Sequence, residues 1–410
     1  MSEATTKIEI IRWKLIGMIV LTLCSVLSSR WAQAKPPAKQ AKASYRVVGY
    51  FLDRGDAASL RALQHVHPAK LTDLYYAFGI IRDGELALGD RVPADKVKAS
   101  FAAMAKLKHS NPHLQILVSV GGWSDSDKFS DTALTAESRA KFAESAVAFV
   151  RRHHLDGIDI DWEFPVSGGE NPDARRPEDK QNYTLFLQAL RDKLDLAAKQ
   201  DKHRYLLTAA VGNNEQFLFN TEMDKVAHIV DWANVMTYDF NGHWNTYAGH
   251  VAPLYDDPTL KHAGNSPKNN IDSVVALFLR AGLPADKLVL GVPFYGYSWK
   301  QCGASNNGQL QDCRGKGRGS FEDGELQFTD IDAGLVNKKG FVRHWNDKAK
   351  VPYLFNTDTG EFISYDDLES LDYKIKYLKT HRLGGAMFWE LAGDRNFVLQ
   401  NKLAHDLLAR

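Results

Sequence analysis

The stretch Asp156-Gly-Ile-Asp-Ile-Asp-Trp-Glu-Phe-Pro165 has acidic residues at alternate positions. Alternate residues of a β-strand point to the same face. Asp159, Asp161 and Glu163 therefore share one face, and the apolar residues between them share the other. Asp156 breaks this alternation, so we expect it where the strand begins, in a structural, hydrogen-bonding role.

Three carboxylates on one strand face repel one another, because such neighbours lie about 6–7 Å apart. Like-charge coupling should raise the pKa of at least one of them and keep a proton on the stack. A carboxyl group that stays protonated at neutral pH suits general-acid catalysis, and Glu163 is the candidate. A hard-cation site and a solvated acidic turn are the alternatives. Acidic turns usually carry Gly, Asn or Ser between the acids, whereas Ile and Trp stand here.

Short runs of β-branched and aromatic residues recur along the chain, most of them apolar on both faces, as buried parallel strands are. The predicted strands are Arg46–Phe51, Asp73–Phe78, Gln115–Val120, Gly157–Trp162, Tyr205–Val211, Asn234–Tyr238, Leu288–Phe294 and Gly385–Trp389. Apolar residues at helical spacing lie between them, for example Phe142, Ala146 and Phe149. The alternation predicts a (β/α)8 TIM barrel with the acids at its C-terminal mouth. An open doubly wound sheet is the alternative, but its glycine-rich nucleotide turn is missing after the first strand.

The connection between the last two predicted strands is too long for a simple crossover. Its segment 297–365 is rich in Gly, Asn, Lys and aromatic residues. We predict a small α+β insertion domain there, between strand 7 and helix 7, with the barrel at 45–296 and 366–410. The insertion holds Cys302 and Cys313, which would pair as a disulfide in an oxidising compartment. Two free thiols are the alternative, and no nearby His or Cys favours zinc.

The first residues resemble an export signal. A basic region ends at Lys14, an apolar run covers Leu15–Leu27, and Ala32-Gln33-Ala34 has the small-x-small pattern of a cleavage site. The apolar run is shorter than the roughly 20 residues of a membrane span, although an uncleaved anchor is the alternative. We expect a signal peptide over 1–34, cleavage near Ala34/Lys35, a tether over 35–44, and a secreted or periplasmic protein free of the membrane.

Charge is nearly balanced, with 51 Lys+Arg against 50 Asp+Glu in 410 residues. This balance offers no electrostatic reason to expect nucleic acid as a partner. We expect a monomer that needs neither a cofactor nor a metal ion.

The carboxylate stretch resembles the signature D-x-x-D-x-D-x-E of glycoside hydrolase family 18, the chitinases. Further motifs that are similar to the family's follow on other predicted strands. They are Ser119-Val-Gly121-Gly122-Trp123, Met236-Thr-Tyr238-Asp239, Gly291–Gly296 and Gly384–Trp389. The resemblance runs from about Tyr45 to the C-terminus, and implies structural roles for Gly121 and Gly122. One departure is Tyr297, because many members have Arg at this position.

The resemblance implies a retaining, substrate-assisted hydrolysis of β-1,4-linked N-acetylglucosamine polymers. Glu163 would protonate the glycosidic oxygen while the sugar's own acetamide attacks and forms an oxazolinium ion. Asp161 would orient that acetamide, Asp159 would share a proton with Asp161, and Tyr238 would hydrogen-bond the acetamide. The other implied substrate contacts are Trp389, Asp239, Met236, Trp123, Trp244, Tyr295, Tyr50, Phe78 and Ser119. Core packing is the alternative for the aromatic residues Trp123, Trp244, Tyr50 and Phe78.

The substrate implied by this resemblance is chitin or chito-oligosaccharides. One alternative keeps the chemistry but acts on N-glycan cores or peptidoglycan-type glycans. Another is a chitin-binding lectin without catalysis. Such lectins lose the glutamate or its neighbouring aspartate, whereas Glu163 and Asp161 both stand here.

Overall fold

The structure is a computed structural model that describes residues 45–409. The predicted signal peptide (1–34) and tether (35–44) lie outside the described residues. Within residues 45–409, no helix combines the length and apolar character needed to cross a membrane.

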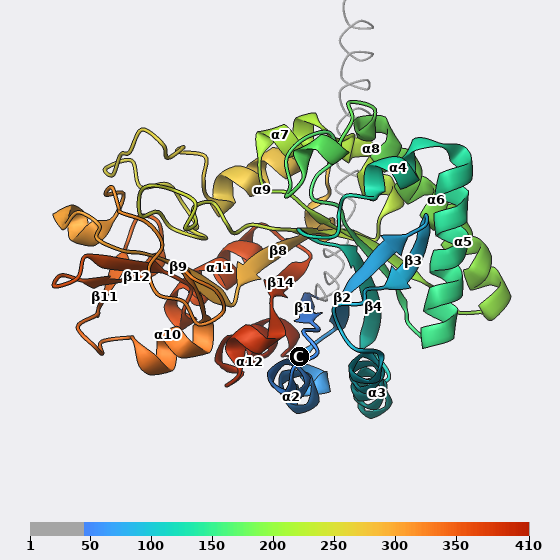
Figure 1. Ribbon diagram of the computed structural model, residues 1–410, viewed down its shortest axis with the longest axis horizontal. Coiled ribbons are helices and arrows are strands. Elements are labelled where there is room, and N and C mark those ends of the chain that lie inside the picture. Colours follow the sequence, from blue (N-terminus) through green and yellow to red (C-terminus); the bar gives the residue numbers. More distant parts are fainter. Residues whose placement is uncertain (1–44, 410) are drawn as a thin grey trace, which may run out of the picture. The chain divides into compact units, whose positions relative to one another are not determined.

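Eight parallel strands close into a barrel, which confirms the predicted (β/α)8 fold (Figure 1). The barrel strands are β1 (Arg46–Leu52), β2 (Asp73–Arg82), β4 (Gln115–Gly121), β5 (Gly157–Asp161), β6 (Leu206–Val211), β7 (Trp232–Val235), β8 (Leu288–Pro293) and β14 (Gly385–Trp389). Strand β1 pairs in parallel with both β2 and β14, and this double pairing closes the ring.

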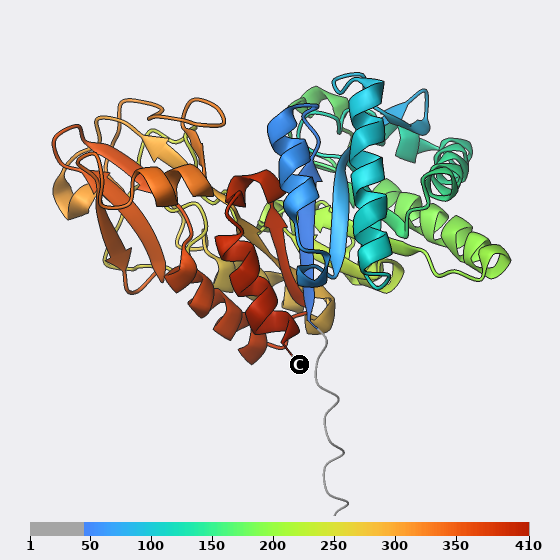
Figure 2. The same cartoon turned by 90° about the horizontal axis from the view of Figure 1, so that it is seen from below.

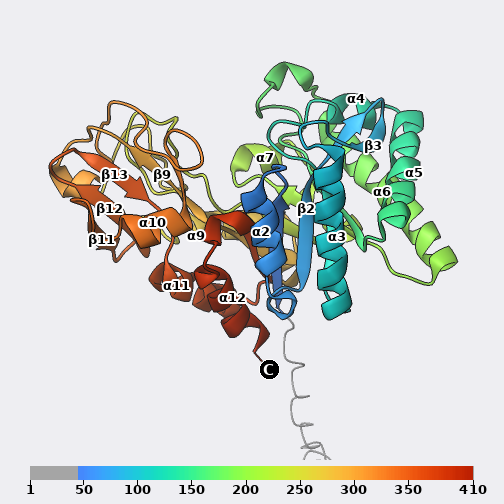
Figure 3. The ribbon, with the colours of Figure 1, turned by 60° about the horizontal axis from the view of Figure 1, so that its bottom comes forward.

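Helices cover the outside of the barrel, and Figures 2 and 3 show α2 and α3 running alongside β1 and β2. The helices of the barrel are α2 (Ala57–His65), α3 (Ala94–Ser110), α4 (Phe129–Leu134), α5 (Ala136–His153), α6 (Asp179–Asp201), α7 (Glu215–Phe219), α8 (Met223–Ile229), α9 (Ile271–Arg280), α11 (Leu368–Thr380) and α12 (Val398–Leu408). Short 3-10 helices are η1 (Pro68–Lys70), η2 (Pro172–Ala174), η3 (Ala285–Lys287), η4 (Ser305–Gly308) and η5 (Leu391–Asp394). Phe142, Ala146 and Phe149 of α5 are buried, as their helical spacing predicts.

The carboxylate strand β5 has the predicted alternation. Ile158, Ile160 and Trp162 belong to the outer core beneath the helices. The indole ring of Trp162 stacks on Phe129 of α4, with ring centroids 5.2 Å apart. The opposite face of β5 therefore points into the barrel.

The predicted bounds of the sixth barrel strand are wrong. The strand expected at Asn234–Tyr238 is β7 at Trp232–Val235. Beyond Val235 the ladder ends, because the Thr237 N–H bonds the Val235 carbonyl at 2.8 Å and the Thr237 hydroxyl bonds the Gly291 carbonyl at 2.7 Å. The structure also contains β3 (Glu85–Leu88), an antiparallel partner of β2 that our reading of the sequence missed.

A second, antiparallel sheet lies between β8 and α11, beside the barrel on the side away from α5 and α6 (Figures 1 and 3). Its order is β10 (Glu325–Gln327), β9 (Tyr295–Trp299), β13 (Glu361–Ser364), β12 (Val351–Asn356) and β11 (Val342–Asn346), with helix α10 (Phe328–Gly334). This sheet begins at Tyr295, slightly before the predicted boundary at 297. Cys302 and Cys313 form a disulfide in the connection between β9 and β10.

Candidate active site

Asp159 is the centre of a hydrogen-bond network inside the barrel, and its side chain is fully buried. Its Oδ2 accepts from the hydroxyls of Tyr50 and Ser119, each at 2.8 Å. Its Oδ1 accepts from Thr208 Oγ1 at 2.6 Å and Asn234 Nδ2 at 3.4 Å. Burial raises the pKa of Asp159, while these hydrogen bonds lower it. Four strands besides β5 thus hold this carboxyl group in one orientation.

Asp161 lies next along the same face and is also buried, but its surroundings differ. Within residues 45–409, its Oδ1 has no hydrogen-bond partner. Burial first, and then the charges of Glu163 and Asp159, raise the pKa of Asp161 well above its ordinary value. A buried carboxyl oxygen without a donor is costly, so this position is prepared for a ligand that brings an N–H or O–H group.

Glu163 follows the end of β5 and is partly exposed. Burial and the nearby charge of Asp239 raise the pKa of Glu163 to about 8. The carboxyl group is therefore protonated at neutral pH. The protonation state required of a general acid is thus set by its surroundings.

Asp239 comes from the segment after β7 and contacts the inserted sheet. Tyr295 donates its hydroxyl to Asp239 Oδ1 at 2.5 Å. Burial raises the pKa of Asp239 to about 6, although hydrogen bonds from Tyr295 and Tyr297 act in the opposite direction. Tyr297, which stands where many members of the resembled family have Arg, is buried beside this carboxylate. The negative charge of Asp239 in turn raises the pKa of Glu163.

Aromatic and sulfur-containing side chains pack around the mouth. The ring of Trp389, at the end of β14, stacks on Phe78 with centroids 5.6 Å apart, and it lies 5.8 Å from the Tyr50 ring. Tyr238 and the partly buried Met236 pack in the same interior cluster. Within residues 45–409, the Tyr238 hydroxyl has only the sulfur of Met387 as a partner, at 3.9 Å. This hydroxyl is therefore available to a ligand.

Trp123 and Trp244 are exposed aromatic residues at the rim, with 52% and 56% of their surfaces accessible. Core packing therefore does not explain either residue. Trp244 meets the ring of Tyr297 edge to face, with centroids 5.2 Å apart. Flat apolar rings that face water are the surfaces on which sugar rings stack.

Gly121 and Gly122 connect β4 to the site and have positive φ angles of 104° and 77°. A Cβ atom on Gly121 would lie 2.4 Å from the Asp161 carbonyl oxygen, and one on Gly122 would lie 2.6 Å from the Phe78 ring. Only glycine fits these close approaches.

Asp156 lies at the opposite end of β5, away from the carboxylates of the mouth. Its Oδ2 accepts from the Ile116 N–H at 2.7 Å and from Lys108 Nζ at 2.5 Å. These contacts join the beginning of β5 to β4 and α3.

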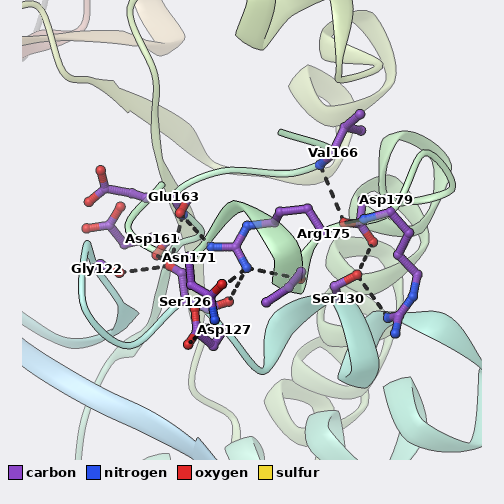
Figure 4. A network of polar contacts seen from close by, with 12 residues as sticks. Gly122, Ser126, Asp127, Ser130, Asp161, Glu163, Val166, Asn171, Arg175 and Asp179 are labelled. Atoms are coloured by element: carbon purple, nitrogen blue, oxygen red, sulfur yellow. Dashed lines mark hydrogen bonds and ion pairs between the residues drawn. The ribbon is translucent and has the colours of Figure 1, made fainter. Parts of the chain in front are cut away.

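Several residues of the site were missed by our reading of the sequence. Thr208 and Asn234 could have been found, because each is a polar residue within an apolar strand. Ser126 and Arg175, which bind the main chain of Glu163, carry no such pattern (Figure 4). No group of three or more His, Cys, Asp or Glu residues within 45–409 is arranged to hold a metal ion.

The barrel and its mouth together define a glycoside hydrolase: a protonated carboxyl group, a buried acceptor beside it, an aromatic floor and exposed tryptophans. The sequence profile of glycosyl hydrolases family 18 matches residues 46–394. The chain therefore belongs to glycosyl hydrolases family 18, which confirms the resemblance of its motifs.

Individual relatives agree with this assignment. Chitinase A1 of Niallia circulans is 44% identical over 94% of this chain, and the match spans 61% of that protein. The structure of chitinase ChiA74 from Bacillus thuringiensis matches with a TM-score of 0.81 at 37% identity, covering 89% of this chain and 70% of that chain. A family 18 N-acetylglucosaminidase from Paenibacillus barengoltzii matches with a TM-score of 0.76 at 37% identity, covering 88% of this chain and 100% of that chain.

Proposed function

We propose that this chain is a chitinase that hydrolyses β-1,4-linked N-acetylglucosamine polymers with retention of configuration. The observation that carries the proposal is the buried Asp161 Oδ1, which has no hydrogen-bond partner within residues 45–409. The acetamide N–H of an N-acetylglucosamine unit would supply the missing donor. The similarity to proteins named as chitinases supports the same substrate.

In the first step, Glu163 transfers its proton to the glycosidic oxygen as the bond from that oxygen to C1 breaks. The acetamide carbonyl oxygen attacks C1 from the other side and forms an oxazolinium ion. Asp161 accepts a hydrogen bond from the acetamide N–H and stabilises the positive charge. Asp159, held by its four donors, keeps Asp161 in place and shares the proton of the carboxyl stack.

In the second step, a water molecule attacks C1 and gives its proton to the Glu163 carboxylate. The C1–oxygen bond of the oxazolinium ring breaks, so the acetamide and the protonated Glu163 are both restored. Two inversions at C1 give net retention. The Tyr238 hydroxyl is available to hydrogen-bond the acetamide oxygen throughout.

The aromatic residues suggest how a long substrate would lie. Trp389 would form the floor under the sugar that reacts. The exposed rings of Trp123 and Trp244 would stack on sugars beyond the cleaved bond. A row of such platforms suits a linear polymer better than a branched N-glycan core.

The test compares wild type with Glu163→Gln and Asp161→Asn on an N-acetylglucosamine hexamer, with products followed by mass spectrometry. Each substitution should lower kcat about 100-fold or more while hexamer binding persists. Glu170→Gln, an exposed residue of the loop after β5, is the matched control and should behave as wild type.

Wild-type hydrolysis by Glu163→Gln would refute the acid assignment. Binding of the hexamer by the wild type without cleavage would favour the lectin alternative. A product mixture of monomers alone would instead favour an N-acetylglucosaminidase, the activity named for the Paenibacillus barengoltzii relative.

We also propose that the chain is exported and acts as a monomer in the periplasm or outside the cell. The basic and apolar regions and the small-x-small site before Lys35 support export. Mass spectrometry of the mature protein should find its N-terminus near Lys35, and size-exclusion chromatography should give the monomer mass. A retained leader or a dimer would contradict these expectations.

A further inference from the structure

Both polar main-chain atoms of Glu163 are held by side chains from other loops (Figure 4). The Glu163 N–H donates to Ser126 Oγ at 2.9 Å. The Glu163 carbonyl oxygen accepts from Arg175 Nη2 at 2.9 Å. Since β5 ends at Asp161, strand pairing no longer fixes the chain at this point. These two contacts replace the strand ladder at the residue that carries the proton.

Ser126 and Arg175 are themselves held firmly. Ser126 is fully buried, and its hydroxyl donates to the Gly122 carbonyl at 2.8 Å. The Arg175 side chain is 1% exposed, and its Nη1 donates to the Ala174 carbonyl at 3.1 Å. Arg175 Nη1 also donates to the Ser126 carbonyl at 3.4 Å, so the two residues that bind the main chain of Glu163 are joined to each other.

The loop after β5 closes over this arrangement. Gly169 has a φ of +82°, and a Cβ atom there would lie 2.1 Å from the Glu163 carbonyl oxygen and 3.0 Å from Arg175 Nη2. Any larger residue would displace the guanidinium or the carbonyl. Glycine at position 169 thus leaves the room that the hydrogen bond between Arg175 and the Glu163 carbonyl needs.

A buried arginine at position 175 is an unfavourable residue for stabilising the loop after β5. Its nearest carboxylate, Asp127, lies 3.9 Å away and is 43% exposed. Its Nε is buried without a hydrogen-bond partner in the described chain. Burying a guanidinium beside one distant carboxylate and with its Nε unpaired is unfavourable, whereas an apolar side chain would fill the space at lower cost. Arg175 is therefore better explained by its hydrogen bond to the Glu163 carbonyl than by a contribution to loop stability.

We infer that Arg175 is a positioning residue that orients the Glu163 carboxyl group by holding the Glu163 carbonyl, with Ser126 holding the N–H. The inference rests on the proposed role of Glu163 as the acid. The carboxyl must come within about 2.6–3.2 Å of the glycosidic oxygen to transfer its proton. A displacement of about 1 Å can cost about 100-fold in rate. Freeing the main chain of Glu163 would permit such a displacement.

The test compares Arg175→Met, which keeps length but no donor, with Arg175→Lys, which keeps a donor. Arg175→Met should lower kcat on the hexamer up to about 100-fold with little change in KM. Arg175→Lys should restore most of the loss. Arg176→Met is the matched control, since Arg176 anchors the same segment to Ser130 and Asp131 without contacting Glu163. Wild-type kcat in Arg175→Met, or an equal loss in Arg176→Met, would overturn the inference.

A second substrate separates positioning from loss of folded enzyme. An aryl chitobioside has a leaving group that needs little protonation, so Arg175→Met should be impaired much less on it than on the hexamer. This ratio does not depend on how much enzyme is folded. Equal impairment on both substrates would indicate a purely structural role and overturn the inference.

A double-variant cycle separates this inference from the proposed function. In the Glu163→Gln background, Arg175→Met should cause little further loss, because the two residues act through one carboxyl group. Full additivity would overturn the inference. If Glu163→Gln alone kept wild-type activity, the proposed role of Glu163 as the acid would fail, whatever Arg175→Met showed.

Discussion

Glu163 owes its proton at neutral pH to its surroundings. Burial makes the largest contribution, and the charge of Asp239 adds to it. With pKa values of about 6 for Asp239 and about 8 for Glu163, neutral solution ionises the first and leaves the second protonated. The charge that delays the ionisation of the acid is therefore present at the pH where the acid must work.

Asp239→Asn should consequently move the alkaline limb of the pH–rate profile to lower pH. In the wild type, kcat/KM on the hexamer should fall as pH rises through about 8, because the protonated form of Glu163 is lost. Without the charge of Asp239, ionisation of Glu163 becomes easier and the fall begins earlier. The exposed Asp323→Asn should leave the limb in place. If the alkaline limb of Asp239→Asn stayed at the wild-type pH or moved to higher pH, another group would control the position of this limb.

Asp159 and Asp161 show how one residue type takes two roles on one strand face. Asp159 is surrounded by four donors, so it is a fixed support. Asp161 has a buried oxygen without a partner in the described chain, so it is ready for a substrate. The difference comes from the neighbouring strands.

Among the helices and strands, the sequence predicted those features that follow from a short repeat of polar and apolar residues. Alternation on β5 places Asp159 and Asp161 inside the barrel and Trp162 outside it. The end of β7 could not be predicted in this way, because the side chain of Thr237 replaces a ladder bond. Arg175 lies in a loop without periodicity, and its contact with Glu163 exists only in three dimensions.

The junction between the inserted sheet and α11 contains a buried ion pair. Lys374 of α11 bonds Asp366, and their side chains are 1% and 0% exposed. The second oxygen of Asp366 accepts from Ser370 Oγ at 2.7 Å. This pair ties the first turns of α11 to the segment that follows β13.

Lys374→Met should lower the free energy of unfolding by about 3–5 kcal/mol, because it leaves a buried carboxylate without its partner. Urea unfolding monitored by fluorescence measures the change. Lys376→Met, an exposed site on the same helix, should have little effect. Adding Asp366→Leu to Lys374→Met should recover much of the lost stability, because no unpaired charge then stays buried. If Lys374→Met were as stable as Lys376→Met, the ion pair would be unimportant for stability.

For the whole molecule, the acid of the active site is expected to cost stability. In the unfolded chain Glu163 has its ordinary pKa of 4.5, and folding raises that pKa to about 8. Above pH 4.5 the unfolded chain loses this proton while the folded chain keeps it until about pH 8. Rising pH therefore favours unfolding through this group.

Glu163→Gln should be more stable than wild type at pH 8, by roughly 1–3 kcal/mol given the partial exposure of the side chain. The difference should shrink as pH falls from 8 toward 4.5 and should be small below pH 4.5, where Glu163 keeps its proton in both the folded and the unfolded chain. Urea titrations of both proteins at several pH values measure it, with Glu170→Gln as the control. A difference that does not change with pH would contradict the raised pKa.

In the proposed mechanism, Glu163 is the only carboxyl acid and base, and the substrate's acetamide is the nucleophile. Proton NMR of the hexamer digest during its first minutes tests this most directly, before mutarotation mixes the anomers. Two displacements at C1 should make the new reducing ends appear first as the β-anomer. Initial release of the α-anomer would mean a single displacement by water, and would contradict catalysis by the acetamide.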